Sequence, residues 1–236
     1  MKRILLAAVI LFGVWITLGD TATRADAPLD ISAITAVAIN GEASSVDITT
    51  APEQPYRASL ARHRSGWFAR WNSVWSYDDC SDSSRMRIDG SLLRIDVGMS
   101  SWFGMSDCRY DIRLNVPRDT AVAIHQQALS ARLGGEFSAV TIDAKAADIS
   151  MVGHAGTISV NSDALRLRMG LDKSGKPEAA TISARMLEAD LDFAAAPALS
   201  YTVTAKASFV DTARSSTPNA PVSLTITGEF VHATIR

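Results

Sequence analysis

The feature that most constrains the fold is a short alternation of apolar and polar residues that recurs from about residue 36 to the end of the chain. In "VTIDAKAADISMVG", Val140 and Ile142 share one face, and Ile149 and Met151 share a face of the next segment. A period of two residues places such side chains on the same side of a β-strand, and no helical period competes with it. We therefore predict an all-β chain. The same pattern occurs at Val37 and Ile39; Val46 and Ile48; Ile112, Leu114 and Val116; Val122 and Ile124; Ile158 and Val160; Leu165, Leu167 and Met169; Leu187, Ala189, Leu191 and Phe193; and Val222, Leu224 and Ile226.

The connectors between these segments narrow the choice of β architecture. The segments recur at intervals of roughly 8 to 12 residues, which is typical of a sandwich, a barrel or a solenoid. After residue 117 the connectors are mostly short, and the small residues Gly134, Gly135, Gly153 and Gly156 allow the chain to turn between segments. A short strand cannot bury its apolar face alone, so each segment must stack on the next. This favours a short β-solenoid of stacked strands, with a sandwich as the alternative.

Two turns and one unusual region complete the predicted organisation. Asn40-Gly41 predicts a tight turn between two strands, and residues 117–120 predict another. Residues 52–110 form an irregular insert, within which "RMRIDGSLLRIDV" still alternates as strands do. At 236 residues the chain can hold one β domain, which we place at residues 26–236.

The N-terminus is typical of an export signal. Lys2 and Arg3 precede an apolar run over residues 4–18, and small residues permit cleavage before Asp26. The run is shorter than the roughly 20 apolar residues of a membrane span. We predict a signal peptide at residues 1–25, with retention as an N-terminal anchor as the alternative. The expected location is the periplasm, the cell envelope or the exterior.

Export affects the interpretation of the two cysteines, Cys80 and Cys108. An oxidising compartment favours a disulfide, and these are the only cysteines in the chain. The alternative is a redox or metal pair, which two isolated cysteines with no nearby histidine do not favour. We predict a Cys80–Cys108 disulfide in the insert.

Several segments resemble a known family. They are "DIRLNVPRDTAVAI", with its strand followed by a turn, and the short phrases "LSARLGG", "AVTIDAKAADISMVG", "GTISV" and "LRLRMG". "VAINGEASSVDIT" is similar to the opening hairpin of the same family. Together they resemble the bacterial putative-adhesin family, exported domains that form short β-solenoids. The resemblance implies an envelope-located, non-enzymatic domain and carries over no catalytic residue.

Composition and motifs argue against several functional classes. With 23 basic and 25 acidic residues the net charge is −2, so neither nucleic acid nor an anionic membrane surface is an expected partner, and membrane contact would come only through an uncleaved N-terminus. "GLDKSGKP" resembles a phosphate-binding loop, but Pro177 replaces the magnesium-binding hydroxyl residue and the following segment alternates like a strand. "GMSSW" departs from the nucleophile-elbow motif. The four histidines are dispersed, so we expect no metal, no cofactor and no catalytic site.

Glu188, Asp190 and Asp192 stand in a row on one face of a predicted strand. Such a row could hold a cation or supply the paired carboxylates of a glycan-cleaving enzyme. The favoured interpretation is ion pairing across strands, because arginines occupy outward positions nearby. These are Arg166, Arg168 and Arg185.

The segment "RHRSGWFARWNSVW" carries the candidate ligand-contact residues. Exposed tryptophan beside arginine can stack on sugar rings or clamp an anionic polymer. The favoured alternative is that these aromatic residues cover an open end of the β core. The candidates are Trp67, Arg70, Trp71, Trp75 and, further along the insert, Trp102.

The sequence therefore predicts an exported, non-enzymatic envelope protein that acts as a structural or adhesion-type interaction module. Its expected partners are an envelope polysaccharide or protein. Two alternatives remain: a glycan-binding or sensory module that uses the tryptophans, and a polysaccharide-cleaving enzyme on a β-solenoid, which would need carboxylates and a basic residue converging on one groove.

The predicted export signal gives the first test. We expect N-terminal sequencing of the protein from fractionated cells to find a mature chain that begins at Asp26 in the periplasmic or extracellular fraction. A chain that retains Met1 and sediments with membranes would instead establish the N-terminal anchor.

Overall fold

The computed structural model describes residues 24–25, 27–64, 84–98, 108–171 and 178–236. In these residues the chain forms β-strands and no helix, so the all-β prediction is confirmed. None of the described residues forms a helix that could cross a membrane. The strands are β1 (Arg24–Ala25), β2 (Leu29–Asp30), β3 (Ala36–Thr49), β4 (Arg57–Arg64), β5 (Arg85–Asp89), β6 (Leu92–Val97), β7 (Cys108–Asn115), β8 (Thr120–Leu171), β9 (Glu178–Asp192), β10 (Leu199–Thr212) and β11 (Val222–Ile235).

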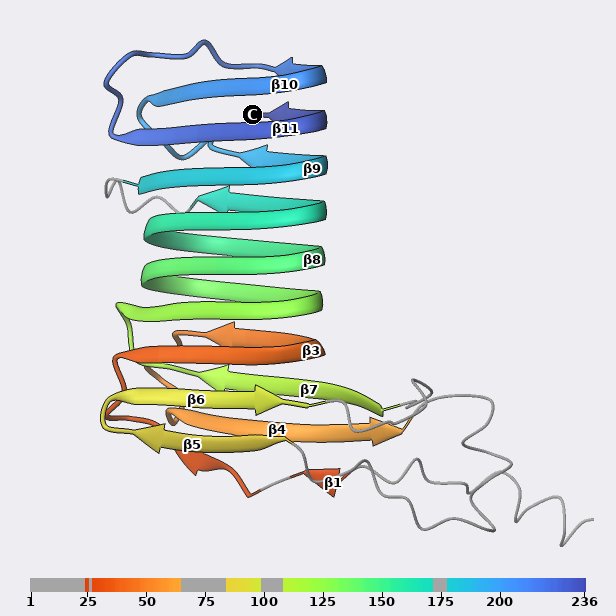
Figure 1. Ribbon diagram of the computed structural model, residues 1–236. Coiled ribbons are helices and arrows are strands. Elements are labelled where there is room, and N and C mark those ends of the chain that lie inside the picture. The colour runs from red at the N-terminus through yellow and green to blue at the C-terminus, as the bar shows by residue number, and fades with distance from the viewer. Residues whose placement is uncertain (1–23, 26, 65–83, 99–107, 172–177) are drawn as a thin grey trace, which may run out of the picture.

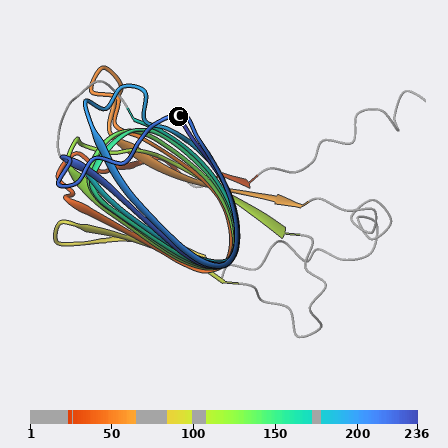
Figure 2. The same ribbon diagram turned by 90° about the horizontal axis from the view of Figure 1, so that it is seen from above.

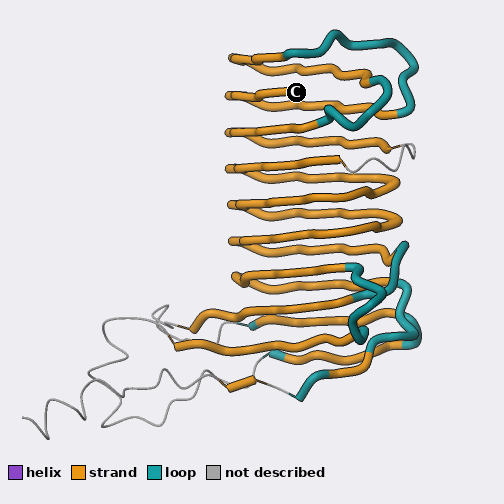
Figure 3. Tube along the Cα trace, turned by 180° about the vertical axis from the view of Figure 1, so that it is seen from behind, coloured by secondary structure: helices purple, strands orange, loops and turns teal. Residues whose placement is uncertain are grey.

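These strands belong to one sheet that winds around a common axis (Figures 1 and 3). Residues 121–134 of β8 pair in parallel with β3, and residues 157–170 of the same strand pair in parallel with β9. A single strand can have both neighbours in this way only if the chain makes complete turns between them. We call each pass of the chain around the axis a rung.

Each rung consists of two straight arms joined by a bend, which we call the corner. In β9 the burial alternates along the strand and is interrupted at Arg185–Met186, where two exposed residues follow one another. The same interruption occurs at Glu42–Ala43 in β3 and at Lys145–Ala146 in β8. Viewed along the axis, the rungs superimpose with their corners together (Figure 2).

The core is made by apolar side chains that stack on one another between rungs. Ile39 pairs in register with Ile124, and Val160, Ile182 and Ile226 succeed one another from β8 to β9 to β11. All five side chains are buried. Rungs in a sheet lie about 4.8 Å apart, so each apolar residue is covered by its neighbours above and below. Burying one such side chain contributes about 1.5 to 3 kcal/mol.

The expected tight turn at Asn40-Gly41 is wrong. β3 continues through these residues and bends at the corner, and its two arms pair in parallel with β6 and β7 respectively. Gly41 has a φ of 146°, and a Cβ atom there would overlap the carbonyl oxygen of Val97. Gly41 therefore allows two rungs to approach closely, and Asn40-Gly41 does not form a hairpin turn.

Other sequence predictions agree with the structure. "RMRIDGSLLRIDV" forms the antiparallel pair β5 and β6, with Gly90 at a φ of 63° in the turn. The turn after β7 contains Asp119 at a φ of 60°, and β8 begins at Thr120. Glu178 begins β9, so a strand rather than a helix follows the "GLDKSGKP" segment.

The order of the last two rungs differs from the order of the chain. β11 lies between β9 and β10 and pairs in parallel with both. As a result, β10 forms the end of the sheet at the top of Figure 1.

The predicted disulfide and ligand-contact residues lie mainly outside the described part of the chain. Cys80 is not among the described residues, and Cys108 is the first residue of β7, so the disulfide stays a prediction. The candidate contact residues Trp67, Arg70, Trp71, Trp75 and Trp102 also fall outside it.

The close approach of successive rungs can be tested at Gly153, which has a φ of 133°. A Cβ atom at this position would overlap the carbonyl oxygen of Gly135. We expect Gly153→Ala to lower the free energy of unfolding in urea by at least about 2 kcal/mol, because it combines a clash with a strained backbone. Gly170→Ala is the matched control, since a Cβ atom there meets nothing within 4 Å. Equal stability of the two variants would contradict the rung spacing described here.

Candidate functional site

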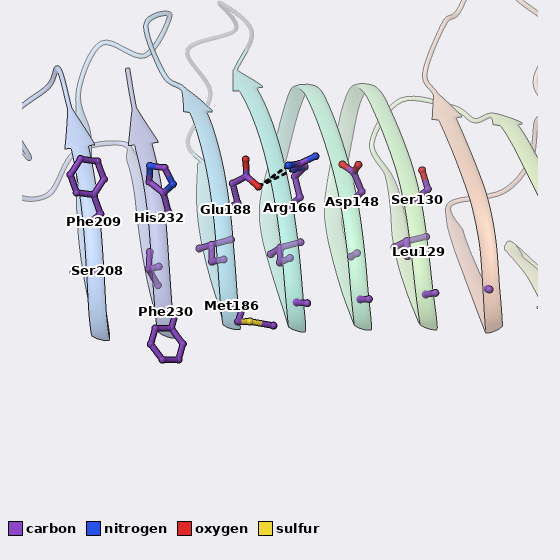
Figure 4. A pocket seen from close by; sticks show the side chains of 18 of the residues that line it. Leu129, Ser130, Asp148, Arg166, Met186, Glu188, Ser208, Phe209, Phe230 and His232 are labelled. Carbon is purple, nitrogen blue, oxygen red and sulfur yellow. Dashed lines mark hydrogen bonds and ion pairs between the residues drawn. The ribbon is translucent and has the colours of Figure 1, made fainter.

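The described residues form an open groove of about 1210 Å³ on the outer surface, which we call the outer groove. It begins beside the corners and crosses β3, β8, β9, β11 and β10 (Figure 4). Outward side chains at equivalent positions of successive rungs form one of its borders. In register these are Arg166, Glu188, His232 and Phe209, and Figure 4 shows them side by side, with Asp148 and Ser130 continuing the row.

The other border is formed at the corners by small residues that give way to large ones. Ala43, Ala128, Ala146 and Ala164 occupy the equivalent positions in β3 and β8. Towards the β10 end, the large side chains Met186 on β9 and Phe230 on β11 replace them (Figure 4), and Ala207 follows on β10. The groove therefore has a narrow alanine border along most of its length and a bulky apolar end.

The apolar end is unusual because its side chains are exposed. Phe209 is 66% exposed, Phe230 60% and Met186 57%. The described residues include five large exposed apolar side chains, and three of them lie in this groove. The Phe209 ring meets the His232 ring edge-on, with ring centroids 5.3 Å apart. Because single exposed apolar residues are ordinary but gathered ones mark interaction surfaces, this end is the strongest candidate for ligand contact.

The charged side chains of the groove are paired: Glu188 with Arg166 inside the groove, and Asp148 with Arg168, which is not one of its lining residues. Both Nε and Nη2 of Arg166 donate hydrogen bonds to Oε2 of Glu188, at 3.1 and 2.9 Å. The hydrogen bond with Glu188 raises the pKa of Arg166, and the charge of Glu188 adds to this. Nη1 of Arg168 lies 3.5 Å from Oδ1 of Asp148. A ligand in the groove thus meets paired charges.

The predicted pairing of the acidic row is confirmed for Glu188 but differs in detail for its neighbours. Asp190 lies 3.5 Å from Arg236, and Asp192 accepts a hydrogen bond of 3.0 Å from the backbone N–H of Ala194. Arg185 pairs with Asp163, at 3.8 Å, instead of with the row. Among the described residues no group of three or more acidic, histidine or cysteine side chains is arranged to hold a metal ion.

Charges of alternating sign follow the corners on the other side of the bend. Lys145, Asp163, Arg185 and Glu229 line a hollow of about 370 Å³ there. Lys206 extends the alternation onto β10, where its Nζ lies 2.8 Å from Oε1 of Glu229. This hydrogen bond lowers the pKa of Glu229, with smaller contributions from the charges of Lys206 and Arg185. We call these five residues the corner charge ladder.

His154, which a cleaving enzyme could use as a basic residue, lies in the interior. His154 is 5% exposed, and its Nδ1 lies 3.3 Å from Oε2 of Glu178, which is itself buried. The backbone N–H of Ala155 donates to the same carboxylate oxygen at 3.3 Å. Neither residue lines the outer groove.

Sequence reasoning missed the apolar end of the groove, although a signal was present. In "SFVD" and "EFVH" two apolar residues follow one another, so Phe209 and Phe230 interrupt the alternation. In a half-buried strand such a residue has no inward position to occupy. A consecutive apolar pair near a corner therefore marks an exposed aromatic residue.

Comparison with solved structures finds proteins whose backbone trace is similar to that of this chain. No family model and no curated protein sequence matches the chain. A putative cell adhesion protein from Clostridium sporogenes is 9% identical with a TM-score of 0.44, over 91% of this chain and 99% of its own. Putative adhesins from Parabacteroides distasonis and Parabacteroides merdae, 7% and 9% identical, both have TM-scores of 0.39, over 92% of this chain and 98% of their own.

The corner charge ladder gives a test of the order of the rungs. Because Lys206 is the main cause of the lowered pKa of Glu229, we expect Lys206→Gln to raise that pKa towards its ordinary value. The titration of the Glu229 side chain can be followed by NMR. Lys145→Gln is the control, because Lys145 is not among the causes of the shift and should leave the pKa of Glu229 unchanged. An unchanged pKa in the Lys206 variant would contradict the placement of β11 beside β10.

Proposed function

We propose that this protein is an exported, non-enzymatic adhesion-type module built on a β-solenoid, and that its outer groove binds an extended polysaccharide of the cell envelope. The observation that carries the proposal is the outer groove itself, which continues across successive rungs and ends in exposed aromatic residues. Its features favour recognition of a polymer over recognition of a small molecule.

The solenoid interpretation is supported by the register of the strands. β3, β8, β9, β11 and β10 follow one another in parallel, and β8 alone supplies pairing partners for both β3 and β9. Consecutive rungs therefore present equivalent residues about 4.8 Å apart along the axis. A polymer laid along this axis contacts an equivalent position on every rung, whereas a small ligand contacts only a few of these positions.

The chemistry of the groove is suited to a sugar chain. Phe209 and Phe230 offer exposed aromatic surface on which a sugar ring can rest, and ligand sites generally combine such apolar contacts with a few polar groups. Ser130, His232 and the paired Arg166 and Glu188 supply hydrogen-bonding groups along the row. Because the charges are already paired, the groove favours a ligand with little net charge.

Binding is favoured over cleavage by the use of the carboxylates. A glycan-cleaving site needs two carboxylates that face one another across the scissile bond. Here Glu188 is engaged by Arg166, and Asp190 lies beside Arg236. The glycan-binding alternative based on the tryptophan-rich segment stays a prediction, because those residues lie outside the described part of the chain.

The proposal is tested by removing the aromatic end of the groove. We expect the double variant Phe209→Ser, Phe230→Ser to bind envelope polysaccharide at least about tenfold more weakly, since each exposed aromatic contact contributes on the order of 1 kcal/mol. Binding would be measured by co-sedimentation with purified peptidoglycan sacculi and by calorimetry with soluble envelope polysaccharides.

Val152→Ser is the matched control, because Val152 is 64% exposed and does not line the groove. An equal loss in the control, or no binding by the unaltered protein, would refute the groove as the contact surface. Shortening of the polysaccharide during the assay would instead establish a cleaving enzyme.

A further inference from the structure

The end of the sheet at β10 is an uncovered edge. This strand is 14 residues long and pairs on one side with β11. In the part of the chain that the structure describes, no strand pairs with its other side. A long unpaired edge offers a row of backbone N–H and C=O groups to another strand.

The interior of the stack is only partly covered at this end, where the Tyr201 hydroxyl donates a hydrogen bond of 3.3 Å to the backbone carbonyl of Arg214. Tyr201, Val203 and Val210 point inward like their registered partners Leu224, Ile226 and Ala233 in β11. The β11 residues are at most 1% exposed, whereas those of β10 are only partly buried. The apolar side chains of β10 pack against one neighbouring strand, whereas those of β11 pack against two. An added rung would complete their burial.

Among the described residues, the loop after β10 covers the start of this edge. The backbone N–H of Tyr201 donates to Oγ of Ser216 at 2.9 Å, and the N–H of Thr217 donates to the carbonyl of Leu199 at 2.8 Å. Backbone groups of alternate residues in a strand point to the same side. The N–H of Val203 therefore points to the same open side as that of Tyr201, and the loop does not reach it. The edge is available from about Val203 to Asp211.

The corner charge ladder indicates the chemistry of the missing neighbour. Asp163, Arg185, Glu229 and Lys206 alternate in sign from one rung to the next. Lys206 ends the series, and its side chain is 74% exposed. Continuation of the series requires an aspartate or glutamate at the corner of the next strand. Opposite charges on neighbouring strands stabilise the pairing, and like charges oppose it.

A second copy of this chain does not satisfy that requirement. Two β10 strands paired antiparallel about a two-fold axis, with their corners aligned, would bring the two Lys206 side chains together. The charge pattern therefore favours a strand from a different polypeptide.

We propose that β10 accepts one β-strand from a partner protein, with alternating apolar residues that complete the interior and an acidic residue at the corner beside Lys206. This interaction adds a rung to the stack, and its specificity comes from the apolar positions and the acidic residue. It is independent of the polysaccharide proposed for the outer groove.

The chain supplies a probe for this edge. β11 sits on the outward side of β9, with its apolar residues in register and Glu229 placed between Arg185 and Lys206. A labelled peptide with the sequence of residues 222–235 carries the chemistry required of the next rung. We expect it to bind the full-length protein saturably, as measured by fluorescence anisotropy at concentrations where the peptide alone is monomeric. The E229K version of the peptide should bind at least tenfold more weakly.

Variants of the protein locate the binding. Val203→Pro removes an N–H that faces the open side without breaking a pair with β11, so it should abolish peptide binding and leave the fold intact. Lys206→Glu should reverse the preference between the two peptides, which tests the proposal even if the proline variant does not fold. Lys145→Glu, at an equivalent corner inside the stack, is the matched control and should bind the peptide normally.

Three outcomes would overturn the proposal: no saturable binding, equal binding of the two peptides, or unchanged binding by Val203→Pro. A dimer of the unaltered protein that Val203→Pro dissociates, seen by analytical ultracentrifugation, would assign the edge to a second copy and overturn it too. Polysaccharide binding should be unaffected by Val203→Pro, so a failure of either proposal can be told from a failure of the other.

Discussion

The stacking of each apolar side chain on an equivalent side chain one rung away is the interaction on which the structure depends. A single rung such as β9 cannot bury its own inward residues. Ile182 is buried because Val160 and Ile226 pack against it from the neighbouring rungs. The same register that aligns the inward residues also aligns the outward ones. The row from Arg166 to Phe209 and the corner charge ladder are therefore consequences of the core. In this fold the register of the core residues determines which surface residues are neighbours.

The sequence predicts the local structure well because burial in a strand has a strict period. Val140, Ile142, Ile149 and Met151 point inward as the alternation requires. The alternation does not indicate which strands are neighbours, because any inward apolar residue can pack against any other. The insertion of β11 between β9 and β10 therefore could not be predicted from it. The charges of Arg185, Glu229 and Lys206 do contain that information, once the corners are known.

The corners explain the error at Asn40-Gly41. A type I′ hairpin turn and this particular corner both place a glycine at a positive φ, so Asn-Gly fits either one. The corners at Arg185–Met186 and Lys145–Ala146 have no glycine. The distinction comes from Val97, whose carbonyl group approaches Gly41 from another rung far away in the sequence. Corners also determine where the candidate site lies, because a bend exposes two residues in succession. Phe230 is exposed for this reason, and an apolar residue at such a position contributes little to the core.

The two ends of the stack are built differently, and the difference bears on how the protein interacts. At the N-terminal end β4 is antiparallel to β7, and its outer side is occupied by the short strands β1 and β2. Short, irregular edges of this kind discourage further pairing. At the C-terminal end β10 remains long, regular and parallel to its neighbour, with inward residues that are only partly buried. Since the stacking that stabilises the fold does not distinguish strands of one chain from strands of another, the long regular edge of β10 is better suited to extension than the two-residue strands β1 and β2.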